Sequence, residues 1–324
     1  MTSFTLGLCR RDQIGEPGPP SEARLEVPNI DCDAHAHSER QIAAAIDLAL
    51  SEVGFMTVRN LGMRRVTLDS LFETSRRFFF KNSDDKTRCA YGAALENFGY
   101  QGFLAESLDP SAPADLKESF TMRNVLANTL PESRWPDSEF RDAVMAFYQE
   151  AVTAASRLQR LLGMALDVPE DYFVKKHSGE NITLRLLHYP PVAASQVAGA
   201  QMGAGAHTDY GMLTLLFQDA VAGLQVRSDA GVWIDVPPQA GAVVVNSGDL
   251  LERWSNGRYR STCHRVLPQS EHLDRYSIAL FVDPDSSTVV EALPSCVSEE
   301  RPARYAATTA GQHLQEKIEA THLA

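Results

Sequence analysis

The stretch that decides the fold is His207-Thr208-Asp209-Tyr210-Gly211-Met212-Leu213-Thr214-Leu215-Leu216-Phe217-Gln218-Asp219. Its apolar second half predicts a strand from Met212 to Gln218. Its start places an imidazole and a carboxylate two positions apart, so on a strand both side chains project from one face. A second histidine, His264, follows 55 residues after Asp209 and could join them from a neighbouring strand. The sequence therefore predicts a cluster of two histidines and one aspartate on a β-rich fold.

Such a cluster has the composition of a metal site. Two neutral imidazoles and one carboxylate leave several coordination positions open, which is the arrangement of facial-triad Fe(II) sites. The open positions suit a bidentate co-substrate and then O2. We interpret His207, Asp209 and His264 as candidate metal ligands.

A second pattern follows shortly after His264. In Arg275-Tyr276-Ser277-Ile278-Ala279-Leu280-Phe281, a strand places Arg275, Ser277 and Phe281 on the same face. A buried arginine needs an anion. Its fork fits a carboxylate in two contacts, and a serine hydroxyl adds a third donor. Fe(II), one aspartate, a doubly negative keto acid and one arginine sum to about zero charge, which a buried site tolerates. An arginine paired with a surface acid is the alternative, but the proximity to His264 favours an anion site.

The second half of the chain is predicted to be a jelly roll. From Asn181 onward, short apolar segments alternate with Pro and Gly turns, as expected of a double-stranded β-helix. Besides Met212 to Gln218, the predicted strands are 183–189, 224–227, 233–236, 242–246, 260–266 and 275–282.

The first half is predicted to be mixed. Helical periodicity indicates helices at 38–53, at 67–80 with Thr67 as N-cap, and at 137–166. The fold class is therefore mainly β with flanking helices, a jelly-roll core and an N-terminal α/β segment. The predicted parts are 1–26 as a poorly anchored arm, 27–136 as an α/β segment with substrate-side loops, 137–180 as supporting helices, 181–300 as the catalytic core and 301–324 as a C-terminal helix.

Several of these stretches together resemble one family, the isopenicillin N synthase-like Fe(II)/2-oxoglutarate oxygenases. The metal strand from His207 to Asp219 is similar to theirs, and the resemblance covers roughly residues 27 to 300. The other matching segments are Val27-Pro28-Asn29-Ile30-Asp31 through Gly54-Phe55, Gly223-Leu224-Gln225-Val226, Asn246-Ser247-Gly248-Asp249, Trp254-Ser255-Asn256-Gly257 and His264-Arg265-Val266.

The resemblance implies an oxygenase that uses Fe(II), 2-oxoglutarate and O2. It would hydroxylate or desaturate an unactivated C–H bond of a small-molecule metabolite and release succinate and CO2. His207, Asp209 and His264 would be the iron ligands. Arg275 and Ser277 would hold the distal carboxylate of 2-oxoglutarate, and Tyr189 would hydrogen-bond the same co-substrate. Many family members have asparagine where this chain has Leu187, which puts one polar contact in doubt.

Candidate substrate-binding residues come from two regions. Arg185 shares the strand face of Tyr189, so it could reach a substrate pocket or instead form a structural salt bridge. Phe281 shares the face of Arg275. The irregular segment 81–136 adds Tyr100, Phe120 and Met122, for which ordinary loop or core packing is the alternative.

Composition limits the partners. The net charge of −12 argues against nucleic acid and anionic membranes. No apolar run approaches a membrane span, and the N-terminus lacks a signal-peptide pattern. Five scattered cysteines without a C-x-x-C pair fit a reducing cytoplasm. The predicted partner is a small-molecule substrate, and the oligomeric state does not follow from the sequence.

Two other functions remain open. A non-catalytic jelly-roll binding protein is disfavoured by the complete set of ligands and the Arg-x-Ser pair. An iron-dependent oxidase that does not use 2-oxoglutarate is not excluded by these motifs. A halogenase is disfavoured because the carboxylate, Asp209, is present.

Overall fold

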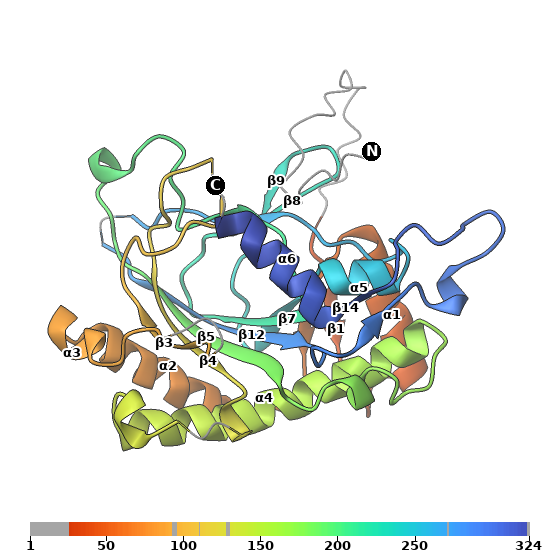
Figure 1. Cartoon of the computed structure of the whole chain (residues 1–324), viewed down its shortest axis with the longest axis horizontal. Coiled ribbons are helices and arrows are strands. Elements are labelled where there is room, and N and C mark those ends of the chain that lie inside the picture. Colours follow the sequence, from red (N-terminus) through yellow and green to blue (C-terminus); the bar gives the residue numbers. More distant parts are fainter. Residues whose placement is uncertain (1–25, 93–95, 110, 128–129, 271, 323–324) are drawn as a thin grey trace.

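The computed structural model describes residues 26–322 apart from 93–95, 110, 128–129 and 271. Two sheets form the centre of the molecule, and helices cover the outer face of the larger one (Figure 1). This arrangement confirms the predicted mainly β fold with a jelly-roll core and flanking helices. The arm predicted for residues 1–26 lies outside the described residues except for Glu26.

The large sheet has eight strands in the order β1-β2-β10-β7-β12-β5-β4-β3. The strands are β1 (Asn29–Asp31), β2 (Phe55–Arg59), β3 (Phe98–Gln101), β4 (Glu118–Arg123), β5 (Asn181–Tyr189), β7 (Leu213–Gln218), β10 (Ala242–Ser247) and β12 (Arg275–Asp283). The small sheet, in the order β6-β11-β8-β9, contains β6 (Ala204–His207), β8 (Leu224–Arg227), β9 (Trp233–Asp235) and β11 (His264–Val266). A two-stranded sheet pairs β13 (Val289–Val290) with β14 (Thr308–Thr309).

The N-terminal segment is part of the same sheet as the jelly-roll strands. β2 pairs with β10 at one side, and β4 pairs with β5 at the other. The segment 102–117, which joins β3 to β4, therefore begins and ends close to the strand that carries Tyr189.

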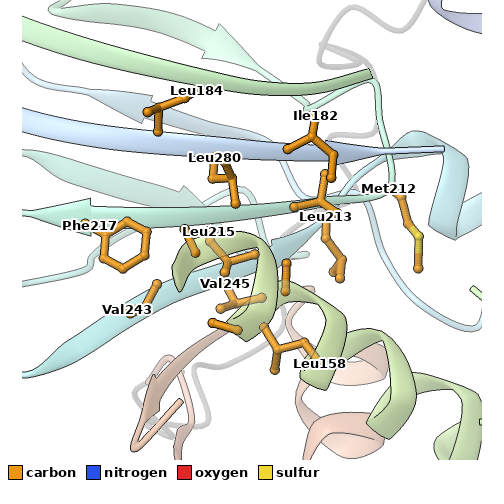
Figure 2. Packing of buried hydrophobic residues seen from close by; sticks show 14 of the residues in the cluster. Leu158, Ile182, Leu184, Met212, Leu213, Leu215, Phe217, Val243, Val245 and Leu280 are labelled. Atoms are coloured by element: carbon orange, nitrogen blue, oxygen red, sulfur yellow. The ribbon is translucent and has the colours of Figure 1, made fainter. Parts of the chain in front are cut away.

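Strand alternation gives the large sheet two different faces. The outer-facing side chains join a hydrophobic cluster with the helices (Figure 2), among them Leu184, Leu215 and Leu280 with Leu158 of α4. The inner-facing side chains form a second cluster with the small sheet, including Leu187 and Ala279 with Val226. Both faces are buried, which explains the nearly continuous apolar runs of β7 and β12.

Three helices cover the outer face. They are α1 (Glu39–Glu52), α2 (Arg65–Phe79) and α4 (Ser138–Ala165), and Figure 1 shows α4 running along the sheet. Ser38 and Gln41 form the capping box that starts α1, and the Asp137 side chain accepts from the Phe140 amide to start α4. These two predicted helices are confirmed.

The predicted start of α2 at Thr67 is wrong. The helix begins at Arg65 with Arg64 as N-cap. Thr67 instead lies inside the first turn and donates its hydroxyl to Glu150 Oε1 of α4 at 2.8 Å. A tertiary contact therefore uses the side chain that we expected to cap the helix.

Short elements complete the fold. They are α3 (Ser83–Thr87), α5 (Asp249–Trp254) and α6 (Ala310–His322), with 3-10 turns at 125–127, 132–134, 174–176, 194–196 and 294–296. α6 lies beside α5 in Figure 1, and an ion pair between Lys317 and Asp249 at 2.6 Å joins the two helices.

Within the described part of the chain, we find no helix with the length and apolarity needed to cross a bilayer.

Candidate metal centre

His207, Asp209 and His264 converge between the two sheets. β6 and β11 pair antiparallel so that His207 lies directly opposite His264. One ligand atom from each of the three side chains lies within 4.8 Å of the others. Asp209 Oδ1 is 3.8 Å from His207 Nε2 and 3.7 Å from His264 Nε2.

The route to this geometry differs from the predicted one. β6 ends at His207, and Asp209 lies in the turn before β7, so the two side chains do not share a strand face. The turn carries the carboxylate to the imidazoles, and the cluster forms nevertheless.

Backbone carbonyls orient both imidazoles. His207 Nδ1 donates to Gly205 O at 2.7 Å, and His264 Nδ1 donates to Thr262 O at 3.1 Å. In the neutral form of each ring, Nε2 then carries no proton, and both Nε2 atoms face Asp209. Such hydrogen bonds on the distal nitrogen fix the tautomer that binds metal.

The Asp209 carboxylate is held from the opposite side by the large sheet. Thr214 Oγ1 of β7 donates to Oδ2 at 2.5 Å, and Asn246 Nδ2 of β10 donates to the same oxygen at 2.7 Å. Asn246 thus contacts a candidate ligand directly. Oδ1 remains available on the side of the histidines.

Protonation states suit metal binding. Burial and the neighbouring His264 lower the pKa of His207 to about 3, against the opposing effect of Asp209. His207 is therefore neutral at neutral pH. Burial disfavours the ionised form of Asp209, but the two histidines, Asn246 and Thr214 together keep the pKa of that carboxyl below its usual value.

Every backbone carbonyl of the turn from Asp209 to Met212 has a donor. The first amides of α5 hold three of them: Asp249 N donates to Asp209 O, Leu250 N to Gly211 O and Gly248 N to Met212 O, at 2.8 to 3.0 Å. The fourth carbonyl, Tyr210 O, accepts from His313 Nε2 of α6 at 3.1 Å. Burial lowers the pKa of His313 to about 4, so its ring is a neutral donor. Two helices therefore fix the turn that carries Asp209.

Arg275 forms a deeply buried cationic site next to this centre. Its side chain is 0% exposed and lies with Ser277 on the inner face of β12. Nη2 donates to Gln218 Oε1 at 2.9 Å. Nε and Nη1 of Arg275 and Oγ of Ser277 have no hydrogen-bond partner among the described residues. The Tyr189 ring lies 4.8 Å from the guanidinium carbon. Three buried donors without partners are unusual in a folded protein and are typical of a site that binds an anion.

Two of the predicted substrate residues lie on the inner face. Phe281 pairs directly with Thr214, the residue that donates to Asp209. Arg185 of β5 pairs with Ala279 of β12. It forms an ion pair with Glu106 at 2.6 Å, as the salt-bridge alternative predicted.

The assignment of Tyr100, Phe120 and Met122 to the substrate pocket is contradicted by their position. Strand alternation turns all three to the outer face, where they join the cluster under the helices. Phe120 packs against Phe78 of α2 and Phe140 of α4, with ring centroids 5.1 and 5.0 Å apart. Tyr100 lines a cavity of about 570 Å³ on that face, together with Lys86 and Glu118. The large sheet separates these side chains from the metal centre.

Several residues of the site carry no local sequence signal. His313, Glu106 and Asp115 contact the centre or its surroundings only because distant segments come together. Thr214 does carry a local signal, because it lies two positions from Leu216 on β7 and therefore on the same inner face.

The jelly-roll fold and the His207-Asp209-His264 cluster are typical of one class, the non-haem iron oxygenases with a facial triad. Residues 181–284 match the 2OG-Fe(II) oxygenase superfamily, and residues 27–138 match the family described as non-haem dioxygenase in morphine synthesis N-terminal.

Relatives and solved structures agree with this class. The 2-oxoglutarate-dependent dioxygenase htyE of Aspergillus rugulosus is 33% identical over 314 residues, covering 88% of this chain and 94% of the relative. The 2-oxoglutarate-Fe(II) type oxidoreductase hxnY of Emericella nidulans is 32% identical over 268 residues, covering 78% and 76%. A full-length Neurospora crassa protein, solved in complex with alpha-KG and thymine, is 30% identical with a TM-score of 0.83, covering 93% of this chain and 99% of that one.

The chain therefore belongs to the 2OG-Fe(II) oxygenase superfamily. It is a dioxygenase that uses Fe(II), 2-oxoglutarate and O2.

The contact from His313 gives a testable prediction. His313→Ala removes the donor to Tyr210 O and leaves one carbonyl of the Asp209 turn unpaired. We expect Mn(II) to bind up to about tenfold more weakly, as for other residues behind a metal ligand. Mn(II) affinity can be measured by electron paramagnetic resonance without turnover.

Two variants serve as controls. His313→Gln keeps a side-chain donor and should recover part of the loss, while Gln312→Ala, on the exposed side of the same helix, should bind as the wild type does. Equal affinity in His313→Ala and wild type would show that α6 does not position Asp209.

Proposed function

We propose that His207, Asp209 and His264 bind the iron, that Arg275, Ser277 and Tyr189 bind 2-oxoglutarate, and that the enzyme oxidises a C–H bond of a small polar metabolite bound beside them. The observation that carries this proposal is the buried Arg275, whose unpaired nitrogens lie on the inner face of the large sheet, which faces the small sheet that carries His207 and His264.

The donor set fits Fe(II). Two imidazoles and one carboxylate are within bonding reach of a single ion, and the distal nitrogens of both imidazoles are already hydrogen-bonded. The carboxylate is ionised and has one free oxygen facing the histidines. A ferrous ion there would supply the activation of O2 and the oxidation chemistry.

The Arg275 site fits a carboxylate. A guanidinium without a counter-ion is costly in the protein interior, and a two-point contact with a carboxylate removes that cost. Ser277 Oγ adds a neutral donor, and the Tyr189 ring covers the guanidinium. Gln218 fixes the orientation of the fork through Nη2.

The interior beside the Arg275 site is lined by apolar side chains. Leu187, directly opposite Ser277 on β5, belongs to the inner cluster with Val226 and Ala279. Such a lining excludes water from the co-substrate and strengthens its contacts with Arg275. Leu187 makes the lining apolar at the position where the resemblance suggested a polar contact.

We infer that Arg185 and Phe281 contact the substrate. Phe281 pairs with Thr214 next to Asp209, and Arg185 faces the same interior two positions from Leu187 on β5. Structural relatives bind small molecules: the Neurospora crassa protein was solved with thymine and with 5-formyluracil, and JOX2 with JA. A cytoplasmic location stays a prediction from the sequence.

The reaction can be tested by its co-product. Purified enzyme with Fe(II) and 2-oxoglutarate should release succinate in proportion to substrate oxidised, in a panel of amino acids, nucleobases, terpenoids and aromatic metabolites. Asp209→Ala should lower this rate by at least about 10³-fold, because the single carboxylate of the three ligands is lost. Oxidation without succinate would instead indicate an oxidase that does not use 2-oxoglutarate.

The role of Arg275 can be tested separately. Arg275→Ala should raise the 2-oxoglutarate concentration needed for half-maximal turnover by about 10²-fold, since truncating a buried charge partner costs about 2 to 5 kcal/mol. Arg77→Ala removes an exposed arginine paired with Glu139 on the surface and should leave this requirement unchanged. An unchanged requirement in Arg275→Ala would assign the co-substrate to another cation.

A further inference from the structure

The inner face of β5, β4 and β3 is unusually polar. On these strands the inward positions are held by Arg185, Ser119, Thr121 and Gln101, of which Ser119 and Thr121 are almost fully buried. The inner face nearer Tyr189 is apolar, as described above. Buried polar side chains are stable only when they are hydrogen-bonded. We call these four residues and their hydrogen-bond partners the polar wall.

Arg185 is the centre of the polar wall. Its Nη2 donates to Glu106 Oε2 at 2.6 Å and to Ser119 Oγ at 2.8 Å. Gln101 Nε2 donates to Glu106 Oε1 at 3.1 Å. Glu106 is therefore held by two strands and lies against the guanidinium.

A second ion pair extends the wall. Lys117 contacts Asp115, and its Nζ lies 3.6 Å from Glu106 Oε2. Although burial opposes ionisation of Glu106, Arg185 and Lys117 lower its pKa to about 2, so Glu106 carries its charge at neutral pH. Burial raises the pKa of Asp115, and Lys117 opposes that effect. Each cation of the wall thus contacts a carboxylate.

The wall connects to the metal centre. Asp115 Oδ1 accepts from Gly205 N at 2.9 Å, and Gly205 O accepts from His207 Nδ1 at 2.7 Å. A continuous set of contacts therefore runs from the metal ligand His207 to Arg185.

One donor of the wall remains unused. Arg185 Nε is buried and has no partner within the residues that the structure describes. The charge of Arg185 is already balanced by Glu106, so what is missing is a hydrogen-bond acceptor rather than an anion. A carboxylate placed there would lie against Glu106 and be repelled.

We propose that the Arg185–Glu106 pair selects an uncharged substrate that presents a carbonyl or similar acceptor to Arg185, and rejects carboxylates. Glu106 is then the residue that determines specificity, because it converts an arginine that would attract acids into a neutral donor. The inference rests on the proposed function in one respect, that Arg185 faces the substrate.

Matched pairs of probes test the charge preference. The probes are indole-3-acetamide with indole-3-acetate, nicotinamide with nicotinate, and thymine with uracil-5-carboxylate, titrated calorimetrically into enzyme loaded with Mn(II) and 2-oxoglutarate. We expect wild-type enzyme to bind the neutral member at least tenfold more tightly wherever a pair binds. Tighter binding of an acid than of its neutral partner overturns the proposal.

Substitution of Glu106 tests the cause. Glu106→Gln keeps the shape and frees the charge of Arg185, so binding of at least one acid should strengthen tenfold or more. Glu139→Gln, which breaks the exposed pair with Arg77, is the matched control and should change nothing. A Glu106→Gln variant that gains no affinity for any of the acids also overturns the proposal.

Binding of Mn(II) and of 2-oxoglutarate is measured before the probes are added. This step distinguishes failure of the proposed function from failure of the proposed role of Glu106. Failure of both to bind would contradict the proposed function itself. Normal binding of both, followed by a preference for acids, contradicts only the role of Glu106.

Discussion

The Asp209 carboxylate is the point at which the two sheets depend on each other. One of its oxygens accepts from Thr214 and Asn246 of the large sheet, and the other faces His207 and His264 of the small sheet. A buried carboxylate is stable only when its hydrogen bonds and counter-charges are complete. The position of the small sheet therefore determines whether the buried Asp209 carboxylate has its counter-charges. It also determines whether His207 and His264 lie close to that carboxylate. In the folded enzyme a ferrous ion would supply the remaining counter-charge to Asp209.

Two further constraints keep this arrangement fixed. The amides at the start of α5 and the His313 ring of α6 bind the four carbonyls of the Asp209 turn, so the turn has little freedom to move. The inner hydrophobic cluster packs β8 and β11 against β5 and β12 and sets the distance between the sheets. Helices in distant parts of the chain thus contribute to the position of Asp209.

Periodicity made much of this predictable. β8 begins and ends where the alternation places it, β12 extends one residue further, and α4 follows the predicted helix closely. The clustering of His207, Asp209 and His264 and the buried position of Arg275 were predictable because their spacing and chemistry are local signals. Asp209 was placed correctly in the cluster and wrongly on a strand, since two-residue spacing does not distinguish a strand from a turn that follows one. Tyr100, Phe120 and Met122 were misplaced because in the irregular segment 81–136 a shift of one residue reverses which face a side chain occupies. Glu106 and His313 depend on contacts between distant segments, which no local pattern records.

The inner face combines two environments along one strand. Near Tyr189 it is apolar around a buried guanidinium, and near Arg185 it is polar with its charges paired. The first environment suits a dicarboxylate co-substrate whose charge Arg275 balances, and the second suits a molecule that brings no charge of its own. We therefore propose that the single strand β5 contributes to two subsites, because its inward residues change from Tyr189 and Leu187 to Arg185.

We propose that His207, Asp209 and His264 share one metal ion while Arg275 holds a carboxylate. The most direct measurement is the anomalous difference map of crystals grown with Mn(II) and 2-oxoglutarate without oxygen. We expect a single manganese peak between the three side chains and 2-oxoglutarate density that extends from it to Arg275 and Ser277. A manganese peak elsewhere, or a co-substrate that leaves Arg275 without a partner, would contradict it.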